Sequence, residues 1–236
     1  MPARIRDVAL HAGVSSATVS RLLANKPHGS EKVRRRVLAA VQELEYQPSR
    51  VARSLRTQRA GTIGLIISDI QNPFFTSLVR AVEDVAYEHR YGVFLCNSDE
   101  DVVKERLYID LLHAERVAGV VISPTRETDN PCRKLVEANT PVVAVDRQML
   151  DLEVDTIIID NVGAAFDIVS HLIGDGYRRI AAVVGPATTT TGLERLEGYS
   201  QALKAHGLSI LSHLMRTGLP KAALGYQFTG ELLEPA

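Results

Sequence analysis

Apolar residues near the start of the chain recur at helical spacing over two short stretches. The inward face of the first stretch comprises Ile5, Val8 and Ala9, and that of the second comprises Val19, Leu22 and Leu23. Gly13 separates them and is the residue that most easily adopts a left-handed helix end. Ser15 then follows as a good N-cap. The pattern predicts a helix, a glycine turn and a second helix.

Helices of two or three turns are not stable alone, so a third apolar helix should cover them. Residues 33–46 supply one, which Pro48 ends. The positions in helical register are Val33, Val37, Leu38, Val41, Leu44 and Glu45. Together the three segments predict an all-α helix-turn-helix head.

Small and hydroxylated residues lie at the start of the second predicted helix. Ser16, Ala17, Ser20 and Arg21 cannot all face the core, so they form its outward face. Small side chains let a helix backbone approach a nucleic-acid groove, and Arg21 can reach a guanine edge or a phosphate. An ordinary capped surface helix is the alternative.

The charge of the chain is divided unevenly along the sequence. Residues 1–60 hold 12 Lys or Arg and 4 Asp or Glu, a net charge of +8, whereas the whole chain carries −1. A basic unit of this kind is typical of phosphate binding. Combined with the helix-turn-helix pattern, it favours DNA binding over a merely solvated surface.

A basic segment, "YQPSRVARSLRTQRAG", follows the predicted head. Ser49 can cap a short helix over residues 50–56 that has three arginines and only Val51, Ala52 and Leu55 as apolar residues. Such a helix should not be stable in isolation. A protruding leucine among arginines fits a minor-groove wedge, and a disordered hinge is the alternative.

From residue 62 onward, continuous apolar runs alternate with helical segments. The predicted strands lie at 62–70, 91–99, 117–123, 141–147, 154–161 and 178–186, and the predicted helices at 75–89, 104–114, 132–138, 162–174 and 194–206. Apolar strands of this kind predict a parallel sheet covered on both faces. The fold class expected here is a doubly wound α/β core.

Ligands of such sheets bind beyond the carboxyl ends of the strands. The residues at those ends are Asp69, Asn72, Phe74, Ser98, Asp99, Ser123, Asp146, Arg147, Asn161 and Gly185. Carboxylates, amides, an aromatic ring and a guanidinium together suit a polyhydroxylated ligand such as a sugar or nucleobase. Taken singly, each residue equally fits a helix cap or a loop.

Motifs of catalysis are absent from the sequence. It contains no G-x-x-x-x-G-K-[ST], no G-x-G-x-x-G after the first strand and no H-E-x-x-H, and its seven histidines are scattered. We expect Cys96 and Cys132 to be free, buried thiols. No enzyme activity, cofactor or metal is therefore expected. With no apolar run of about 18 residues and no apolar N-terminal segment, the chain is expected to be cytoplasmic.

The stretch "IRDVALHAGVSSATVSRLLANKPHGSEKVRRRVLAAVQELEYQPSRVARSL" resembles the DNA-binding head of the lactose-repressor (LacI/GalR) family of bacterial regulators. "TIGLIISDIQNPFF", "RVAGVVIS", "PVVAVDR", "IIIDNVGAA" and "GYRRIAAVVGP…RLEGY" resemble the effector-binding core of that family, a periplasmic-binding-protein-like fold. The resemblance covers about residues 4–206.

This resemblance implies roles for individual residues. It implies that Ser16, Ala17 and Arg21 face base edges, and that Thr18, Ser20 and Asn25 contact or orient phosphates. It places Ala52, Arg53 and Leu55 in a hinge helix, with Leu55 wedged into a central base step of the operator. It suggests Asp69, Phe74, Arg147 and Arg195 as effector contacts.

Four parts are expected along the chain. They are a DNA-binding domain at 1–48, a hinge helix at 49–60, a first lobe of the effector-binding core at 61–160 and a partial second lobe at 161–236. A second doubly wound lobe needs on the order of 100 further residues to close. The expectation is therefore a truncated regulator for which the response to an effector stays open.

The expected function is that of a sequence-specific transcription regulator, and the family resemblance implies that it is a repressor. It would bind a pseudo-palindromic DNA operator as a homodimer, under control of a small sugar or nucleobase-like effector. The alternatives are a sugar-binding protein with no DNA role, a sugar-modifying enzyme and a fragment without function.

Overall fold

The computed structural model describes residues 3–23, 29–46 and 61–234. The chain divides into two compact units, residues 1–60 and residues 61–236. In the described residues no helix is long and apolar enough to cross a membrane.

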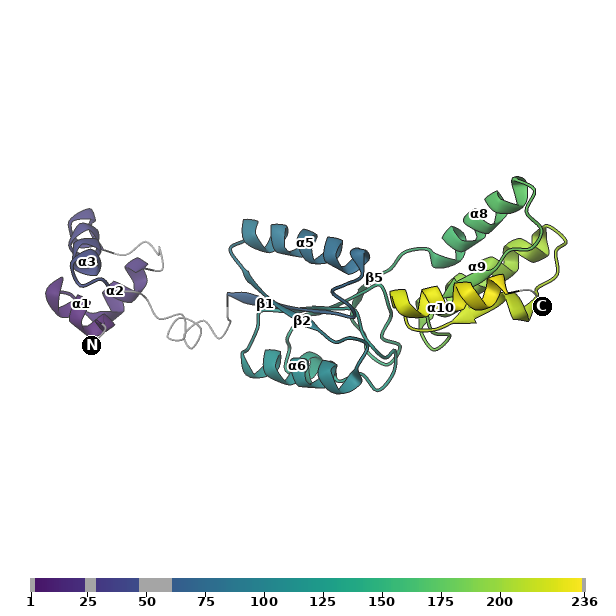
Figure 1. Cartoon of the computed structure of the whole chain (residues 1–236). Coiled ribbons are helices and arrows are strands. Elements are labelled where there is room, and N and C mark those ends of the chain that lie inside the picture. Colours follow the sequence, from purple (N-terminus) through teal and green to yellow (C-terminus); the bar gives the residue numbers. More distant parts are fainter. Residues whose placement is uncertain (1–2, 24–28, 47–60, 235–236) are drawn as a thin grey trace. The chain divides into compact units, whose positions relative to one another are not determined.

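Three helices form the first unit: α1 (Ile5–His11), α2 (Ser16–Leu23) and α3 (Glu31–Glu43) (Figure 1). Gly13 has a φ of 60°, and the N–H of Val14 donates to the carbonyl of Ala9 at 2.9 Å. This left-handed end confirms the glycine turn predicted between α1 and α2. The buried core comprises Val8, Ala9, Ala12, Val19, Val37 and Ala40, and the predicted inward residues Ile5, Leu22 and Leu23 pack against it while partly buried.

Helix α3 differs from the prediction at both ends. It begins at Glu31 because the hydroxyl of Ser30 accepts from the N–H of Val33 at 3.4 Å. It ends at Glu43 because the chain turns at Glu45, which has a φ of 47°. The predicted inward positions Leu38 and Glu45 were wrong: Leu38 is 50% exposed, Glu45 is exposed, and Ala40 is buried instead.

Five parallel strands form the main sheet of the second unit, in the order β2-β1-β3-β4-β5. Their bounds are β1 (Thr62–Ile67), β2 (Gly92–Asn97), β3 (Val120–Ile122), β4 (Val142–Val145) and β5 (Asp155–Ile157). The intervening helices are α5 (Pro73–Glu88), α6 (Val102–Ala114) and α7 (Arg133–Glu137). This alternation confirms the α/β class, and the order places a topological switch point between β1 and β3.

Helices α5 and α6 lie on opposite sides of this sheet (Figure 1). Leu65, Ile67 and Phe75 are buried on the α5 side. The larger core on the α6 and α7 side includes Ile66, Ile109, Leu112, Val120, Ile122 and Leu135. Coverage of both faces is incomplete, contrary to the prediction, because all of β5 and half of β2 remain exposed at the two edges of the sheet.

The remainder of this unit contains α8 (Asn161–Gly174), β6 (Ala182–Val184), α9 (Thr190–Ala205), a 3₁₀ turn (Ser212–Leu214), β7 (Met215–Thr217) and α10 (Ala222–Leu233). β6 and β7 pair in parallel as a separate two-stranded sheet. Its core is formed by Val169, Ile173, Ile180, Ala182, Tyr199, Ala202 and Leu203. Helix α9 begins four residues before the predicted start, because Thr189 caps the N–H of Gly192 at 3.2 Å.

Candidate nucleic-acid interface and ligand pocket

The start of α2 is fixed by Ser15. Its hydroxyl accepts from the N–H of Thr18 at 3.1 Å and lies 3.0 Å from the Thr18 hydroxyl. The N-cap predicted at Ser15 is therefore confirmed. The same contact orients Thr18 at the opening of the helix.

Ala17 and Arg21 lie one turn apart on α2 and are both exposed, whereas Ser16, Thr18 and Ser20 are half-buried. The first turn of α2 thus presents a methyl group and hydroxyl groups, followed by a guanidinium. Such a surface admits close approach to the edges of base pairs in a major groove. The other residues assigned to DNA, Asn25, Ala52, Arg53 and Leu55, lie outside the described residues.

Arg36 of α3 braces the turn between α1 and α2, a role that sequence reasoning missed. Its guanidinium donates to the carbonyl oxygens of Ala12 and Gly13, the latter at 3.3 Å. A cation at the carbonyl end of a helix is favourable, because those carbonyls carry partial negative charge. Arg36 therefore fixes the angle at which α2 leaves α1.

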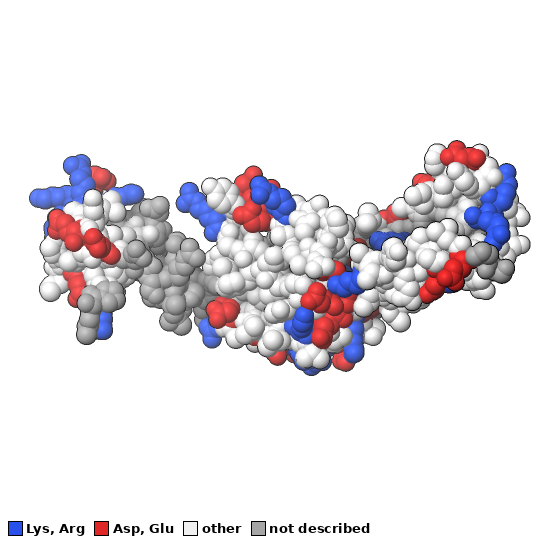
Figure 2. Space-filling model, in the orientation of Figure 1, with Lys and Arg blue, Asp and Glu red and all other residues white. Residues whose placement is uncertain are grey.

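Basic side chains gather over α3 on the face of the head seen in Figure 2. Lys32, Arg34 and Arg35 are exposed residues of α3. Among the described residues of the head, the acidic side chains in ion pairs are Glu31, 3.8 Å from Arg35, and Glu43, 2.7 Å from His11. The basic surface thus remains largely available for phosphate groups.

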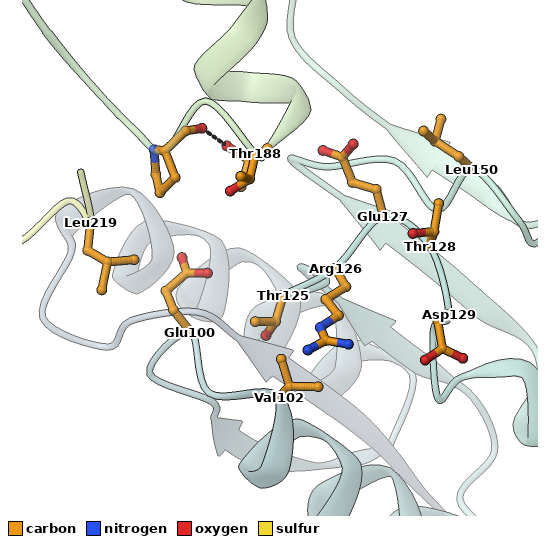
Figure 3. Close-up of a pocket in the computed structure, with 12 residues that line it drawn as sticks. Glu100, Val102, Thr125, Arg126, Glu127, Thr128, Asp129, Leu150, Thr188 and Leu219 are labelled. Carbon is orange, nitrogen blue, oxygen red and sulfur yellow. Dashed lines mark hydrogen bonds between the residues drawn. The ribbon is translucent and has the colours of Figure 1, made fainter. Parts of the chain in front are cut away.

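A cavity of about 560 Å³ opens in the second unit beside the carboxyl ends of the strands (Figure 3). It is lined by Glu100, Val102, Thr125, Arg126, Glu127, Thr128, Asp129, Leu150, Pro186, Thr188, Thr189 and Leu219. Figure 3 shows the carboxylates of Glu100 and Glu127 directed toward the side of the cavity where Thr188 lies. Its volume suits a small molecule, and its location follows the rule for parallel sheets.

Arg147 lies behind this cavity and is held by Glu100. The two terminal nitrogens of Arg147 donate to the two carboxylate oxygens of Glu100, each at 2.7 Å. Nη1 also donates to the carbonyl of Pro124 at 3.2 Å. Burial lowers the pKa of Arg147, but hydrogen bonds and charge from Glu100 outweigh it and leave the pKa raised. The guanidinium is therefore a fixed positive charge.

Strained backbone surrounds this ion pair. Asp99, Glu100 and Asp146 have φ values of 54°, 61° and 71°, in the left-handed region that L residues rarely adopt. Each such residue costs on the order of 1–3 kcal/mol and persists only where its surroundings hold it. Burial raises the pKa of Asp146, and the positive charges of Arg147 and Arg195 oppose that shift. Such a concentration of strain and perturbed pKa is typical of a functional site.

Asp69 is buried at the end of β1, and its carboxylate is fully engaged. One oxygen accepts from the N–H of Gln71 at 2.9 Å, and the other lies 2.7 Å from Nζ of Lys221, in the segment before α10. Lys221 is also 3.9 Å from Asp99, whose other oxygen pairs with Lys104 at 2.7 Å. This chain of charges connects the strand ends to the start of α10.

The other two expected effector contacts lie apart from this chain of charges. Arg195 on α9 donates to the side chain of Asn161 at 2.9 Å. Phe74, 42% exposed, meets Phe75 edge-on with ring centroids 5.0 Å apart. None of the four predicted contacts lines the cavity itself. Sequence reasoning missed the lining residue Glu100, which lies in a loop, and Lys221, which is 152 positions from its partner Asp69. No pattern among neighbouring residues marks either of them.

Below the cavity, Glu105 of α6 is wholly buried. It accepts the N–H of the lining residue Thr125 at 2.7 Å. Burial raises its pKa, and the hydrogen bonds from Thr125 oppose that shift. Glu105 therefore supports the wall of the cavity at a cost in desolvation. Within the ranges that the structure describes, no group of three His, Cys, Asp or Glu side chains is placed to hold a metal ion.

Comparison with known proteins identifies the family of both units. Residues 4–49 match "Bacterial regulatory proteins, lacI family", and residues 60–235 match "Periplasmic binding proteins and sugar binding domain of LacI family". The second match extends beyond the limit near residue 206 that the sequence resemblance suggested.

Individual relatives are similar over most of the chain. A ribose operon repressor of Halalkalibacterium halodurans is 42% identical over 85% of this chain and 59% of its own length. The Lac repressor dimer bound to operator and the anti-inducer ONPF is 28% identical, with a TM-score of 0.81 over 99% of this chain and 70% of that one. The complex of the transcriptional regulator CelR with cellobiose is 30% identical, with a TM-score of 0.65 over 98% of this chain and 70% of that one.

The chain thus spans 59% of the length of the ribose operon repressor that it matches. Both family descriptions, the parallel α/β sheet and the helix-turn-helix head agree with one another. The chain belongs to the LacI family of bacterial regulatory proteins.

Proposed function

We propose that this chain is a sequence-specific DNA-binding transcription regulator that acts as a repressor. The observation that carries the proposal is the exposed pair of Ala17 and Arg21 on α2, in a unit with a net charge of +8. Small residues admit the helix to the major groove, and the arginine supplies a bidentate donor for guanine. Ser16 would face base edges beside them, while Thr18, Ser20 and Asn25 would contact or orient phosphates.

The segment between the two units has a proposed role of its own. Residues 49–60 would form a hinge helix on the operator, with Ala52 and Arg53 at the minor groove and Leu55 wedged into a central base step. An apolar wedge acts only on DNA that can kink, so this contact would favour particular central sequences. The four-part organisation at 1–48, 49–60, 61–160 and 161–236 is part of the same proposal.

A dimer would present two heads to a symmetric operator. An apolar stripe runs along α6, where Val103, Leu107 and Leu111 follow one another at intervals of four residues and are exposed. Phe94, on the neighbouring edge strand β2, is exposed as well. Apolar side chains gathered in this way are typical of a protein contact. We assign this surface to the contact between two copies, and the Lac repressor bound to operator is itself described as a dimer.

The cavity in the second unit would bind the effector, a sugar or nucleobase-like molecule. Its polar lining and the carboxyl-end location support a polyhydroxylated ligand. The CelR relative is described in complex with cellobiose. Asp69, Phe74, Arg147 and Arg195 remain proposed effector contacts. The cavity would bind the effector without catalysing a reaction. A regulator of this kind would act in the cytoplasm, where the chromosome lies.

Selection of binding sites from a random pool of duplex DNA tests the proposal. The full chain should enrich one sequence with two-fold symmetry, because each head reads one half-site. The variant in which Arg21 becomes Ala should lose preference at one position of each half-site. A pool that remains random after several rounds would contradict sequence-specific binding.

A further inference from the structure

Glu100 occupies the two terminal nitrogens of Arg147, one of the two donor pairs that an anionic ligand would use. Its two carboxylate oxygens lie 2.7 Å from Nη1 and Nη2, the paired donors that recognise phosphate or carboxylate groups. The side chains are 5% and 7% exposed, for Arg147 and Glu100 respectively, so the pair is desolvated. A phosphate could take these two nitrogens only by leaving a buried carboxylate without its partner, and at Nε it would meet the carboxylate of Asp146.

Further carboxylates surround the same guanidinium. Asp146 lies 3.8 Å from Nε of Arg147, and Glu127 lines the cavity while its carboxylate accepts from the N–H of Thr190. Asp129 also lines the cavity, and the one cation among its lining residues is Arg126, an exposed side chain. In Figure 3 the Arg126 guanidinium points away from Glu127, toward Thr125 and Val102. Negative charge therefore prevails at the wall of the cavity.

Hydroxyl groups would meet this arrangement differently. A hydroxyl can donate to a carboxylate oxygen of Glu100 or Glu127 and accept from a guanidinium without separating the pair. An added phosphate would instead place its charge against several carboxylates. Two consecutive left-handed residues, Asp99 and Glu100, hold the loop that carries this carboxylate in position.

We propose that Glu100 is a charge gate, so that the cavity accepts an uncharged polyhydroxylated ligand and rejects its phosphorylated or carboxylated counterparts. This inference rests on the proposed effector-binding function. It adds the charge class of the effector and names the residue that sets it. Glu100 acts on specificity by keeping the terminal nitrogens of Arg147 from an anionic ligand.

The test uses the full chain, with ribose, ribose 5-phosphate and inorganic phosphate as probes at matched ionic strength. Binding is measured by calorimetry, and folding is checked by the thermal melt. Wild-type protein should show no response to inorganic phosphate and should bind ribose 5-phosphate about a hundredfold more weakly than ribose. Equal or tighter binding of either phosphate compound by the wild type would overturn the proposal.

The variant Glu100→Gln should gain anion binding, because Arg147 loses its carboxylate. We expect about tenfold tighter binding of ribose 5-phosphate and a rise in melting temperature with inorganic phosphate. A second exchange, Arg147→Gln in the same chain, should abolish the gain. Asp84→Asn on α5 removes one charge from an exposed pair with Arg80 and should change nothing. A folded Glu100→Gln protein without any gain would also overturn the proposal.

These outcomes separate the gate from the proposed function. Gain of phosphate binding in Glu100→Gln, with no ribose binding by the wild type, would leave the gate standing and remove ribose as an effector. Ribose binding together with undiminished ribose 5-phosphate binding would leave effector binding standing and remove the gate. If Glu100→Gln does not fold, the comparison of the two sugars in the wild type decides alone.

Discussion

Lys221 and Asp69 form an ion pair across 152 positions of the sequence, with Nζ 2.7 Å from Oδ2. Asp69 is buried at the end of β1, whereas Lys221 is partly exposed just before α10. The pair therefore ties the five-stranded sheet to the last helix of the second unit. Either residue alone would look like an ordinary loop residue in the sequence.

Replacing Lys221 by Met should lower the free energy of unfolding of the second unit by about 1 kcal/mol, a modest value because the ammonium is partly exposed. The pKa of Lys221 is raised, chiefly by its hydrogen bond to Asp69. Its contribution is thus present below the ordinary lysine pKa and lost as pH rises through the raised value. Denaturation in urea across this alkaline range measures both effects. Adding Asp69→Asn should recover part of the loss, and strict additivity would contradict the pairing.

Exchange of Glu105 for Gln should stabilise the protein at neutral pH. The amide oxygen can still accept the N–H of Thr125, while the cost of a buried charge disappears. Because burial raises the pKa of Glu105, the folded chain holds this proton more tightly than the unfolded chain does. Wild-type stability should therefore fall relative to E105Q as pH rises above the ordinary value of 4.5.

Urea denaturation at several pH values measures this difference. We expect E105Q to exceed the wild type by about 1 kcal/mol at neutral pH. The advantage should vanish in acid, where both states of the wild type are protonated. Glu105→Leu serves as the control, since it removes the acceptor of Thr125 as well and should destabilise. An E105Q advantage that grows in acid would contradict the account.

The variant Gly13→Ala should destabilise the three-helix head. Its φ of 60° is unfavourable for alanine, and the new Cβ would meet Nη2 of Arg36 at 2.5 Å. We expect a loss of about 1–2 kcal/mol, visible as faster amide hydrogen exchange in α1 and α2. Gly29 offers a matched control, since its φ is 80° but a Cβ there would meet only Val33 at 3.5 Å. Equal losses at the two glycines would show that Arg36 does not constrain the turn.

A charge at Leu107 should weaken the proposed dimer. Leu107 is 54% exposed at the centre of the apolar stripe on α6. Leu107→Asp would bury a carboxylate in that contact, and we expect at least about a tenfold higher dimer Kd by sedimentation equilibrium. Tyr226→Asp, at an exposed position of α10, is the control and should leave the Kd unchanged. A higher dimer Kd for Tyr226→Asp than for Leu107→Asp would place the dimer contact on another surface.

Arg34 is exposed on α3 and suits a phosphate contact. Arg34→Ala should weaken binding to every DNA sequence by a similar factor and reduce the slope of log K against log salt by about 0.9. Titrations at several salt concentrations measure the slope. Arg80→Ala on α5 removes the same charge outside the head and should not alter it. A changed sequence preference with an unchanged slope would assign Arg34 to base contacts instead.

Local patterns predicted most elements of the fold. The apolar spacing around Val8 and Val19, the turn at Gly13 and the cap at Ser15 each depend on neighbours a few residues away. Alternating apolar runs likewise predicted the parallel strands in their correct sequence order. Errors arose where a helix end depended on a turn without glycine, as at Glu45.

Long-range partners within the candidate site could not be predicted. Arg147 and Asp69 were found as residues at strand ends, but their partners Glu100 and Lys221 follow from how separate loops meet. The brace from Arg36 to the turn is similar, since it joins α3 to carbonyl groups of the backbone. Carbonyl oxygens are present at every residue, so no pattern of side chains marks the ones that are used.

Fluorescence anisotropy of the full chain on DNA tests the central claim most directly. The duplexes are the region upstream of its own gene and a scrambled copy, at about 50 and 200 mM salt. The account predicts tight binding to the upstream duplex, much weaker binding to the scrambled one and a steep loss of affinity with salt for both. Equal and weak binding to the two duplexes would contradict a sequence-specific regulator.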